Sequence, residues 1–405
     1  MPNDLTGTQT KPFAGGRASV LKAPGQSFAS LDFLRGLSAF AVLISHTAAS
    51  VSGTTSLLAF NWGALAVDVF MMMSGFLMMW HFYERRTLGE SWGSSKTCLK
   101  FYTRRFFRIA PLYYFLLVLV YCFHNGLIQV AAQNHLDLHQ TPEVGPHDPT
   151  RDAVSFGHVL SHFTFTFGFI PCFAASQFLP DWSIGLEMQF YLFFPFLALL
   201  LERSQFVGGV VLLVLINWVS LHVFGVGVFA EPKWLGLFPF PTFLPLRINC
   251  FLAGMLLAAG LFEKHNPIKR SFLLLLGLVV AGIYMKKFLL ICFAFSFYEL
   301  ATTCGTGLPG LDQTVRRSGR WLGSRVFKFA AEASYGVYLI HAPVLFLVLR
   351  LLIRVCPFVG LSPVWRFLVC LAVMLPLVYA LAFLAFKYIE TPGINWGRKM
   401  VKRIR

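Results

Sequence analysis

Ten apolar stretches of 15 to 25 residues dominate this sequence and limit the folds open to it. They lie at 31–50, 62–82, 109–129, 183–201, 207–226, 245–262, 271–285, 288–303, 333–354 and 364–388. A helical run of this length matches the hydrocarbon thickness of a bilayer, and a helix satisfies its own backbone hydrogen bonds. The sequence therefore predicts an all-α integral membrane protein with about ten transmembrane helices.

The composition excludes an ordinary soluble domain. Hydrophobic residues make up 56% of the chain and charged residues only 13%, while the net charge is +16. A basic excess on so apolar a chain favours contact with anionic lipid over nucleic-acid binding. We therefore expect membrane lipid as a partner and no nucleic acid.

Lysine and arginine gather in alternate loops between the apolar stretches. With the N-terminus in the cytoplasm, the basic residues of 85–108, 263–270, 316–325 and 398–405 all fall on the cytoplasmic side. Cytoplasmic loops of membrane proteins carry such an excess of positive charge. The sequence therefore predicts that both termini are cytoplasmic.

The chain divides into three parts. Residues 1–28 are polar and rich in Gly, Ser, Thr and Pro, which predicts a disordered cytoplasmic tail. The transmembrane domain takes 29–392, and a basic cytoplasmic tail takes 393–405. Within the longest outer loop, the apolar segment 158–172 is too short to span, so we expect an interfacial or re-entrant helix there.

Histidines are concentrated in and around this loop. His135 and His139, and likewise His158 and His162, are four residues apart, a spacing that can bind a metal ion on a helix. No carboxylate or cysteine completes a recognisable signature. We therefore expect solvated or interfacial histidines and no metal site.

The first apolar stretch carries Arg35 and His46. An ionisable group within a span is costly to bury and marks a candidate functional site. Eleven residues separate the two, almost three helical turns, so they share one face and lie roughly 16 Å apart along the axis. Singly, Arg35 could snorkel to the headgroups and His46 could be a hydrogen-bonded core residue; the shared face favours a common function.

Two carboxylates are predicted to lie at the depth of His46. Topology places Asp68 of the second stretch and Glu187 of the fourth in the outer half of the membrane. A carboxylate beside an imidazole holds one tautomer and stabilises the protonated form. The alternatives are an interfacial acid at Asp68 and a carboxylate that complements a helix N-terminus at Glu187.

Further polar groups are open to two interpretations. The arginines before the third helix form either a phosphate-binding patch or only a membrane anchor; they are Arg104, Arg105 and Arg108. Arg247 near the outer end of the sixth stretch either binds an anionic acceptor or faces headgroups. Tyr338 and His341 of the ninth stretch either line the cavity or hydrogen-bond a neighbouring helix.

Six pieces of the sequence together carry a resemblance. They are Leu31–Gly36 followed by His46, Asp68–Leu77, Arg104–Pro111, Trp182–Tyr191, Ala333–His341 and Tyr388–Pro392. In this order they resemble the acyltransferase-3 family of membrane O-acyltransferases, which modify bacterial surface polysaccharides and some small secreted molecules. The resemblance covers about residues 31–392, and the ordered set is far more specific than any single piece.

The resemblance implies a multi-pass enzyme of the bacterial cytoplasmic (inner) membrane. It would move an acyl group, acetyl on family grounds, from cytoplasmic acyl-CoA to an acceptor hydroxyl. Acetyl-CoA would be a co-substrate, with no cofactor bound. The acceptor classes are a cell-surface polysaccharide or exopolysaccharide, a lipid-linked sugar or a small hydroxylated metabolite. The sequence leaves open whether the chain forms a homo-oligomer.

The resemblance also assigns roles to residues. The family's first-helix arginine and histidine fall on Arg35 and His46, and its arginine-rich motif falls on Arg104, Arg105 and Arg108. We expect these arginines to bind acyl-CoA and His46 to act as general base, oriented by Asp68 or Glu187. Arg35 or Ser183 would stabilise the oxyanion. The expected acceptor-side residues are Trp182, Ser183 and Arg247.

One departure and several alternatives remain. Where the family commonly has two acids in the fourth-span motif, this chain has Glu187 followed by Met188, which puts any two-acid scheme in doubt. An acyl-enzyme on His46 is open beside direct transfer. The main rival function is a transporter or flippase for a glycan or its precursor, since intramembrane charges also line transport paths. A noncatalytic scaffold is the third.

Overall fold

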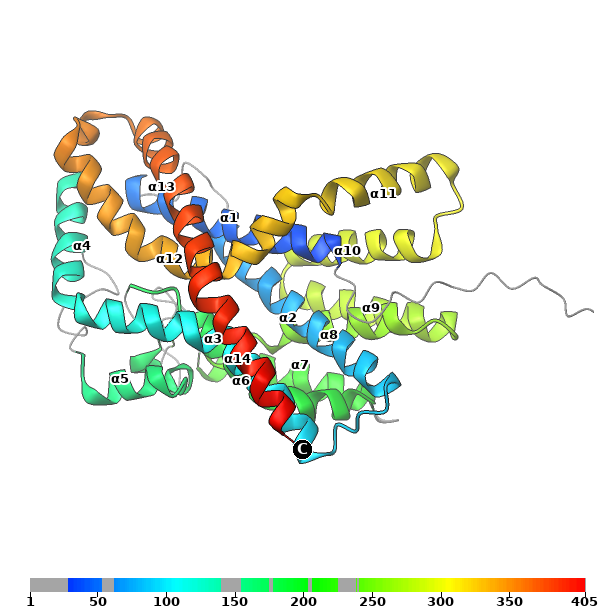
Figure 1. The fold of residues 1–405 in the computed structure, drawn as a ribbon. Coiled ribbons are helices and arrows are strands. Elements are labelled where there is room, and N and C mark those ends of the chain that lie inside the picture. Colours follow the sequence, from blue (N-terminus) through cyan, green and yellow to red (C-terminus); the bar gives the residue numbers. More distant parts are fainter. Residues whose placement is uncertain are drawn as a thin grey trace, which may run out of the picture.

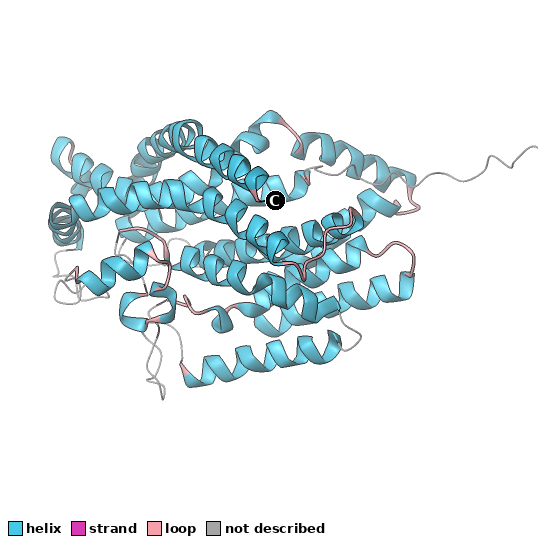
Figure 2. Cartoon of the chain, turned by 60° about the horizontal axis from the view of Figure 1, so that its bottom comes forward, coloured by secondary structure: helices cyan, strands magenta, loops and turns pink. Residues whose placement is uncertain are grey.

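The protein is built from helices (Figure 1). The computed structural model describes residues 28–52, 62–139, 154–174, 178–202, 206–224, 238 and 240–404, and these contain no strand (Figure 2). The helices are α1 (Ala29–Ser52), α2 (Trp62–Thr87), α3 (Ser95–Cys122), α4 (His124–His139), α5 (Phe156–Phe163), α6 (Trp182–Glu202), α7 (Phe206–Val223), α8 (Ile248–Phe262), α9 (Pro267–Tyr284), α10 (Lys286–Cys304), α11 (Pro309–Leu322), α12 (Arg325–Val355), α13 (Pro363–Ala385) and α14 (Thr391–Arg403). Most of the predicted disordered tail, 1–27, lies outside the described residues.

The all-α membrane class is confirmed. Within the described ranges, eight helical segments are long and apolar enough to cross a membrane: α1, α2, α3, α6, α7, α10, α12 and the continuous α13–α14 segment. The other two predicted stretches correspond to α8, a shorter apolar helix, and α9. Every predicted stretch therefore overlaps at least one helix, while the number of crossings and the side of the termini stay predictions.

The predicted bounds of the third stretch, 109–129, were wrong. The helix α3 begins at Ser95, well before the apolar run, and ends at Cys122. At Phe123 the chain turns into α4. A hydropathy pattern misses the start of α3 because its first turns are polar. Since α3 begins at Ser95, the arginine-rich motif lies on a helix rather than in a loop.

The apolar segment 158–172 forms no long helix. It contains most of α5 and two 3₁₀ turns, Phe167–Phe169 and Pro171–Phe173. A short helix is present here, as predicted, while its interfacial or re-entrant position stays a prediction. The segment just before α8 is held by α6. The side chain of buried Gln189 donates a hydrogen bond to Thr242 O and accepts one from Leu244 N.

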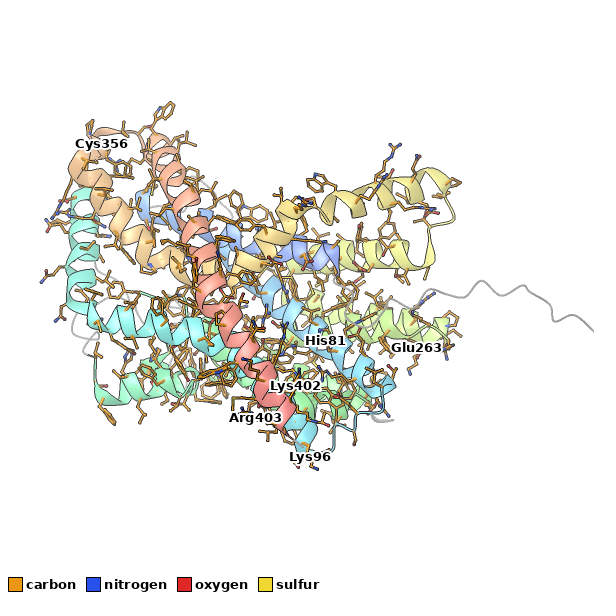
Figure 3. All side chains as sticks on the ribbon, in the orientation of Figure 1. His81, Lys96, Glu263, Cys356, Lys402 and Arg403 are labelled. Carbon is orange, nitrogen blue, oxygen red and sulfur yellow. The ribbon has the colours of Figure 1, made fainter. Side chains whose placement is uncertain are left out.

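Loops and helix ends that contain lysine or arginine lie together at one end of the molecule. Lys96, Glu263, Lys402 and Arg403 lie in the lower and right part of Figure 3, while Cys356 lies at the upper left. The α2–α3 loop, the α8–α9 loop and the end of α14 therefore share one end, as the charge pattern predicts. We call this the basic end.

Glycines allow α2 and α8 to cross closely. A Cβ atom at Gly75 would lie 2.1 Å from Phe251 O, and one at Gly254 would lie 2.0 Å from Met72 O. Small residues let helix backbones approach in this way inside membranes, where packing replaces the hydrophobic effect between helices. The crossing fixes α2, and α1 packs between α2 and α12.

The predicted basic tail after residue 392 forms part of α14, which packs against α3. A Cβ atom at Gly393 would lie 2.5 Å from Pro111 Cγ, and one at Gly397 would lie 2.6 Å from Phe107 Cβ. The middle of α3, which carries the arginine-rich motif, is therefore held by the C-terminal helix.

The α2–α8 crossing gives a stability prediction. Gly254→Ala should lower the free energy of unfolding by about 1–3 kcal/mol, because the added methyl group meets backbone atoms that cannot rotate away. Thermal unfolding in detergent micelles measures the change. Gly208→Ala in α7 is the matched control, since a Cβ atom there meets nothing within 4 Å; equal behaviour of the two variants would contradict the packing account.

Candidate active site

His46 lies near the outer end of α1 and contacts a second histidine. Its Nδ1 is 3.1 Å from Nε2 of His341 on α12, and the ring centroids are 4.9 Å apart. His46 is exposed, whereas its neighbours Leu43 and Thr47 are fully buried. The imidazole is therefore held in place and still accessible to a substrate.

The sequence led us to expect that Asp68 orients His46. In the structure its carboxylate instead contacts residues at the start of α8. Its carboxylate lies 3.5 Å from the Arg247 guanidinium and 3.7 Å from Cys250 Sγ, both at the start of α8. Asp68 is on the face of α2 that packs against α8, while His46 faces α12. The same contact shows that Arg247 forms an ion pair within the protein.

Glu187 is also not beside His46 and Asp68. Ser74 Oγ donates to its carboxylate at 2.8 Å, and the Tyr191 hydroxyl donates to the same oxygen. Ser74 is six residues beyond Asp68 on α2, roughly 9 Å deeper along the helix. The prediction placed Glu187 too far toward the outer end. Glu187 lies more than one turn inside α6, at the depth of Ser74 and closer to the arginines of α3.

Arginines of α1 and α3 converge near the basic end of the molecule. Arg35 is half-buried and lies within electrostatic range of Arg105, Arg108 and Tyr191. The Arg105 guanidinium lies over the Tyr191 ring, 5.5 Å from its centroid, and within electrostatic range of Glu187. Like charges held together in this way form a natural anion site. We call Arg35, Arg105 and Arg108 the arginine cluster.

Arg104 and Arg105 also line a small pocket at the basic end. Its volume is about 130 Å³, and its walls are Met78, His81, Arg85, Trp92, Phe101, Arg104 and Arg105. The walls combine three guanidinium groups with aromatic rings. Two of the predicted phosphate-binding arginines, Arg104 and Arg105, thus share a concave surface, and Arg35 and Arg108 are not among its walls.

A row of polar side chains on α12 connects the arginine cluster with His46. Tyr335 lies within electrostatic range of Arg108, and its hydroxyl donates to Ile109 O at 2.8 Å. One turn further, the hydroxyls of Tyr338 and Ser183 are 2.7 Å apart. The Tyr338 ring lies 6.1 Å from the ring of His341, which contacts His46. We call Tyr335, Tyr338, Ser183 and His341 the polar row.

Sequence reasoning had not assigned roles to most of these partners. Ser74 and Tyr191 were not identified, although Tyr191 is one turn after Glu187. Tyr338 and His341 were left open between cavity and helix contact. The signal was the three-residue spacing of Tyr335, Tyr338 and His341, which keeps successive side chains on adjoining faces of α12.

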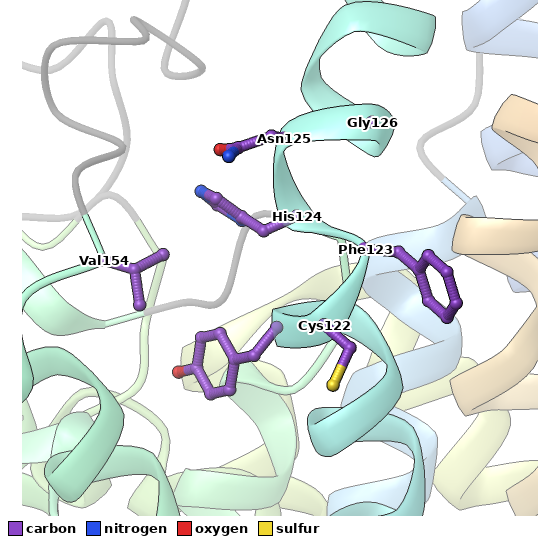
Figure 4. A pocket seen from close by; sticks show the side chains of 7 residues that line it. Cys122, Phe123, His124, Asn125, Gly126 and Val154 are labelled. Atoms are coloured by element: carbon purple, nitrogen blue, oxygen red, sulfur yellow. The ribbon is translucent and has the colours of Figure 1, made fainter.

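Two further features remain: the predicted acceptor-side residue Trp182 and a pocket that the sequence did not predict. Trp182 stacks on Phe240, with centroids 6.0 Å apart. A pocket of about 360 Å³ at the α3–α4 break is lined by Tyr121, Cys122, Phe123, His124, Asn125, Gly126 and Val154 (Figure 4), and none of these is a predicted site residue.

The loop histidines do not gather into a metal site in the described part of the chain, where no three metal-ligating side chains cluster. His162 of α5 is fully buried beside Asp181, with its Nε2 at 3.5 Å from the carboxylate. Burial lowers the pKa of His162 to about 4. Its Nδ1 faces His158 O at 2.9 Å, so this histidine is a neutral, hydrogen-bonded core residue at neutral pH.

Two comparisons with known proteins found similar sequences. The acyltransferase-3 family, described as an acyltransferase domain, matches residues 28–383. The peptidoglycan O-acetyltransferase OatA of Listeria monocytogenes is 25% identical over 398 residues, which cover 90% of this chain and 55% of the relative. The chain thus spans about half the length of that relative. No solved structure matches the chain.

The Asp68–Arg247 contact predicts coupled stability. Arg247→Met should lower the free energy of unfolding by about 3–5 kcal/mol, because it leaves the buried Asp68 carboxylate without its guanidinium. Adding Asp68→Asn should recover part of that loss. Thermal unfolding of both single variants and the double variant measures the coupling. Strictly additive losses would show that the two side chains do not interact.

Proposed function

The chain belongs to the acyltransferase-3 family, and from this premise we propose that it is a membrane O-acetyltransferase. The proposed donor is acetyl-CoA on the cytoplasmic side, and the proposed acceptor is a hydroxyl of a cell-surface glycan or lipid-linked sugar. The observation that carries the proposal is the polar row, which joins a cluster of permanent cations to an accessible imidazole.

The arginine cluster is the proposed site for the CoA phosphates. Guanidinium groups match phosphate oxygens in pairs, and Arg104 and Arg105 line a pocket at the basic end. Arg35 and His46 are eleven residues apart on one helix, roughly 16 Å along its axis. The pantetheine arm would follow the polar row over this distance and bring the thioester toward His46.

His46 is the proposed general base. It accepts the proton of the acceptor hydroxyl, whose oxygen attacks the thioester carbonyl carbon. The tetrahedral oxyanion would be stabilised by a hydroxyl of the Ser183–Tyr338 pair, since Arg35 lies with the arginine cluster, roughly 16 Å from His46 along α1. The carbon–sulfur bond then breaks, and the proton passes from His46 to the CoA sulfur, which yields an O-acetylated acceptor and free CoA.

The acceptor would approach from the end opposite the arginine cluster, where His46 is exposed. The relative is named for acting on peptidoglycan, which supports a glycan acceptor. Positive charge in the last turns of α2 and α14 supports a cytoplasmic basic end, cytoplasmic termini and a place in the inner membrane. The transporter reading gains no support, because both comparisons point to acyl transfer.

Loss of the proposed base gives the direct test. In membranes supplied with labelled acetyl-CoA and a glycan acceptor, His46→Ala should transfer label about 10²- to 10⁴-fold more slowly, the usual contribution of a general base. His222→Ala is the matched control, since His222 is an exposed histidine of α7 that contacts Trp218 O. Unchanged transfer by His46→Ala would remove the proposed base, and glycan flux without acetylation would favour a transporter.

The arginine cluster predicts a separate effect on donor binding. Arg105→Ala should raise the KM for acetyl-CoA about 10- to 100-fold, because each charge-assisted hydrogen bond contributes about 1.5–3 kcal/mol. Steady-state kinetics with varied acetyl-CoA measures it. Arg320→Ala, which removes an exposed arginine of α11, should leave KM unchanged. Equal KM values for the two variants would show that Arg105 does not bind the donor.

A further inference from the structure

The contact between His46 and His341 determines which ring nitrogens carry protons. His341 Nδ1 lies 3.1 Å from Val337 O, one turn earlier on α12. A carbonyl oxygen only accepts, so His341 Nδ1 carries the hydrogen. In a neutral ring Nε2 is then an acceptor, and it lies 3.1 Å from His46 Nδ1. His46 must therefore donate from Nδ1, which leaves a lone pair on its Nε2.

We propose that His341 is a positioning residue for the transfer reaction, which holds His46 in the tautomer whose Nε2 is free to accept a proton. The inference rests on the proposed function, in which His46 is the base. In serine hydrolases a carboxylate fixes the histidine tautomer by accepting from Nδ1. Here a neutral imidazole takes that place, and a backbone carbonyl orients it in turn.

The surroundings leave this task to His341. The two carboxylates expected to orient His46 are engaged elsewhere, Asp68 with Arg247 and Glu187 with Ser74. His341 is only 1% exposed, so its ring is fixed by packing. A second imidazole also adds no charge to an apolar interior, where an ionised carboxylate would be costly without a cation.

His341 gains and loses no proton during the cycle. When His46 Nε2 accepts the hydroxyl proton, the new imidazolium keeps its Nδ1–H bond to His341 Nε2. That bond is then charge-assisted and therefore stronger than in the resting state. The proton leaves from His46 Nε2 to the CoA sulfur, which restores the starting tautomers.

Two substitutions separate positioning from packing. His341→Leu removes the acceptor, and it should lower kcat about 10²-fold or more with the KM for acetyl-CoA unchanged within about twofold. His341→Gln supplies an amide oxygen that can accept from His46 Nδ1, so it should stay within about tenfold of wild-type kcat. Thermal unfolding in detergent identifies any variant that fails to fold, and His222→Leu is the control.

A spectroscopic measurement completes the test. With ¹⁵N-labelled histidine, the His46 signals, assigned by their loss in His46→Ala, should show a protonated Nδ1 and a bare Nε2. In His341→Leu the Nε2–H form should appear. Wild-type transfer that persists at full kcat in His341→Leu, or a His46 protonated on Nε2 in the wild type, would overturn the inference. Absence of wild-type transfer would instead overturn the proposed function, and the ¹⁵N signals would still decide the tautomer.

Discussion

Hydrocarbon offers polar side chains no hydrogen-bond partner, and this constraint organises the interior of the protein. Each polar group carried into the helix bundle has to meet another, so polar groups gather where helices face one another. His46 meets His341, Ser183 meets Tyr338, and Asp68 meets Arg247. The candidate site follows from this pairing, because α1, α6 and α12 share one polar surface.

The pairing divides the interior into regions of different chemistry. Permanent cations lie toward the basic end, where phosphate groups could reach them, and neutral hydroxyls and imidazoles lie along α12 beyond them. Asp68 and Arg247 form a separate pair against α8. Such an arrangement suits a donor with an anionic head and an uncharged arm. The cations can bind the head, while the reacting atoms at the end of the arm lie among neutral side chains.

The sequence was sufficient for the fold class because hydropathy and helix length report directly on the bilayer. The separation of Arg35 and His46 also follows from their spacing within one helix, while their roles stay predictions. The sequence predicted the wrong neighbours for Glu187. The distance of a residue from the start of its helix does not determine which side chains of other helices it contacts. The sequence also predicted that Asp68 lies beside His46. Asp68 instead faces α8, because Gly75 and Gly254 allow α2 and α8 to pack closely, and the sequence pattern did not reveal this helix contact. Partners from distant helices, such as His341, depend on helix packing, which single-sequence patterns do not specify.

The central claim is that one continuous path joins the arginine cluster to His46. A cryo-electron microscopy structure with a non-hydrolysable acetyl-CoA analogue tests it directly. The account predicts phosphate density against Arg35, Arg105 and Arg108, an arm along Tyr335 and Tyr338, and the acetyl carbonyl beside His46. An analogue bound elsewhere, or an arm that stays at the basic end while His46 faces a separate space, would contradict the account.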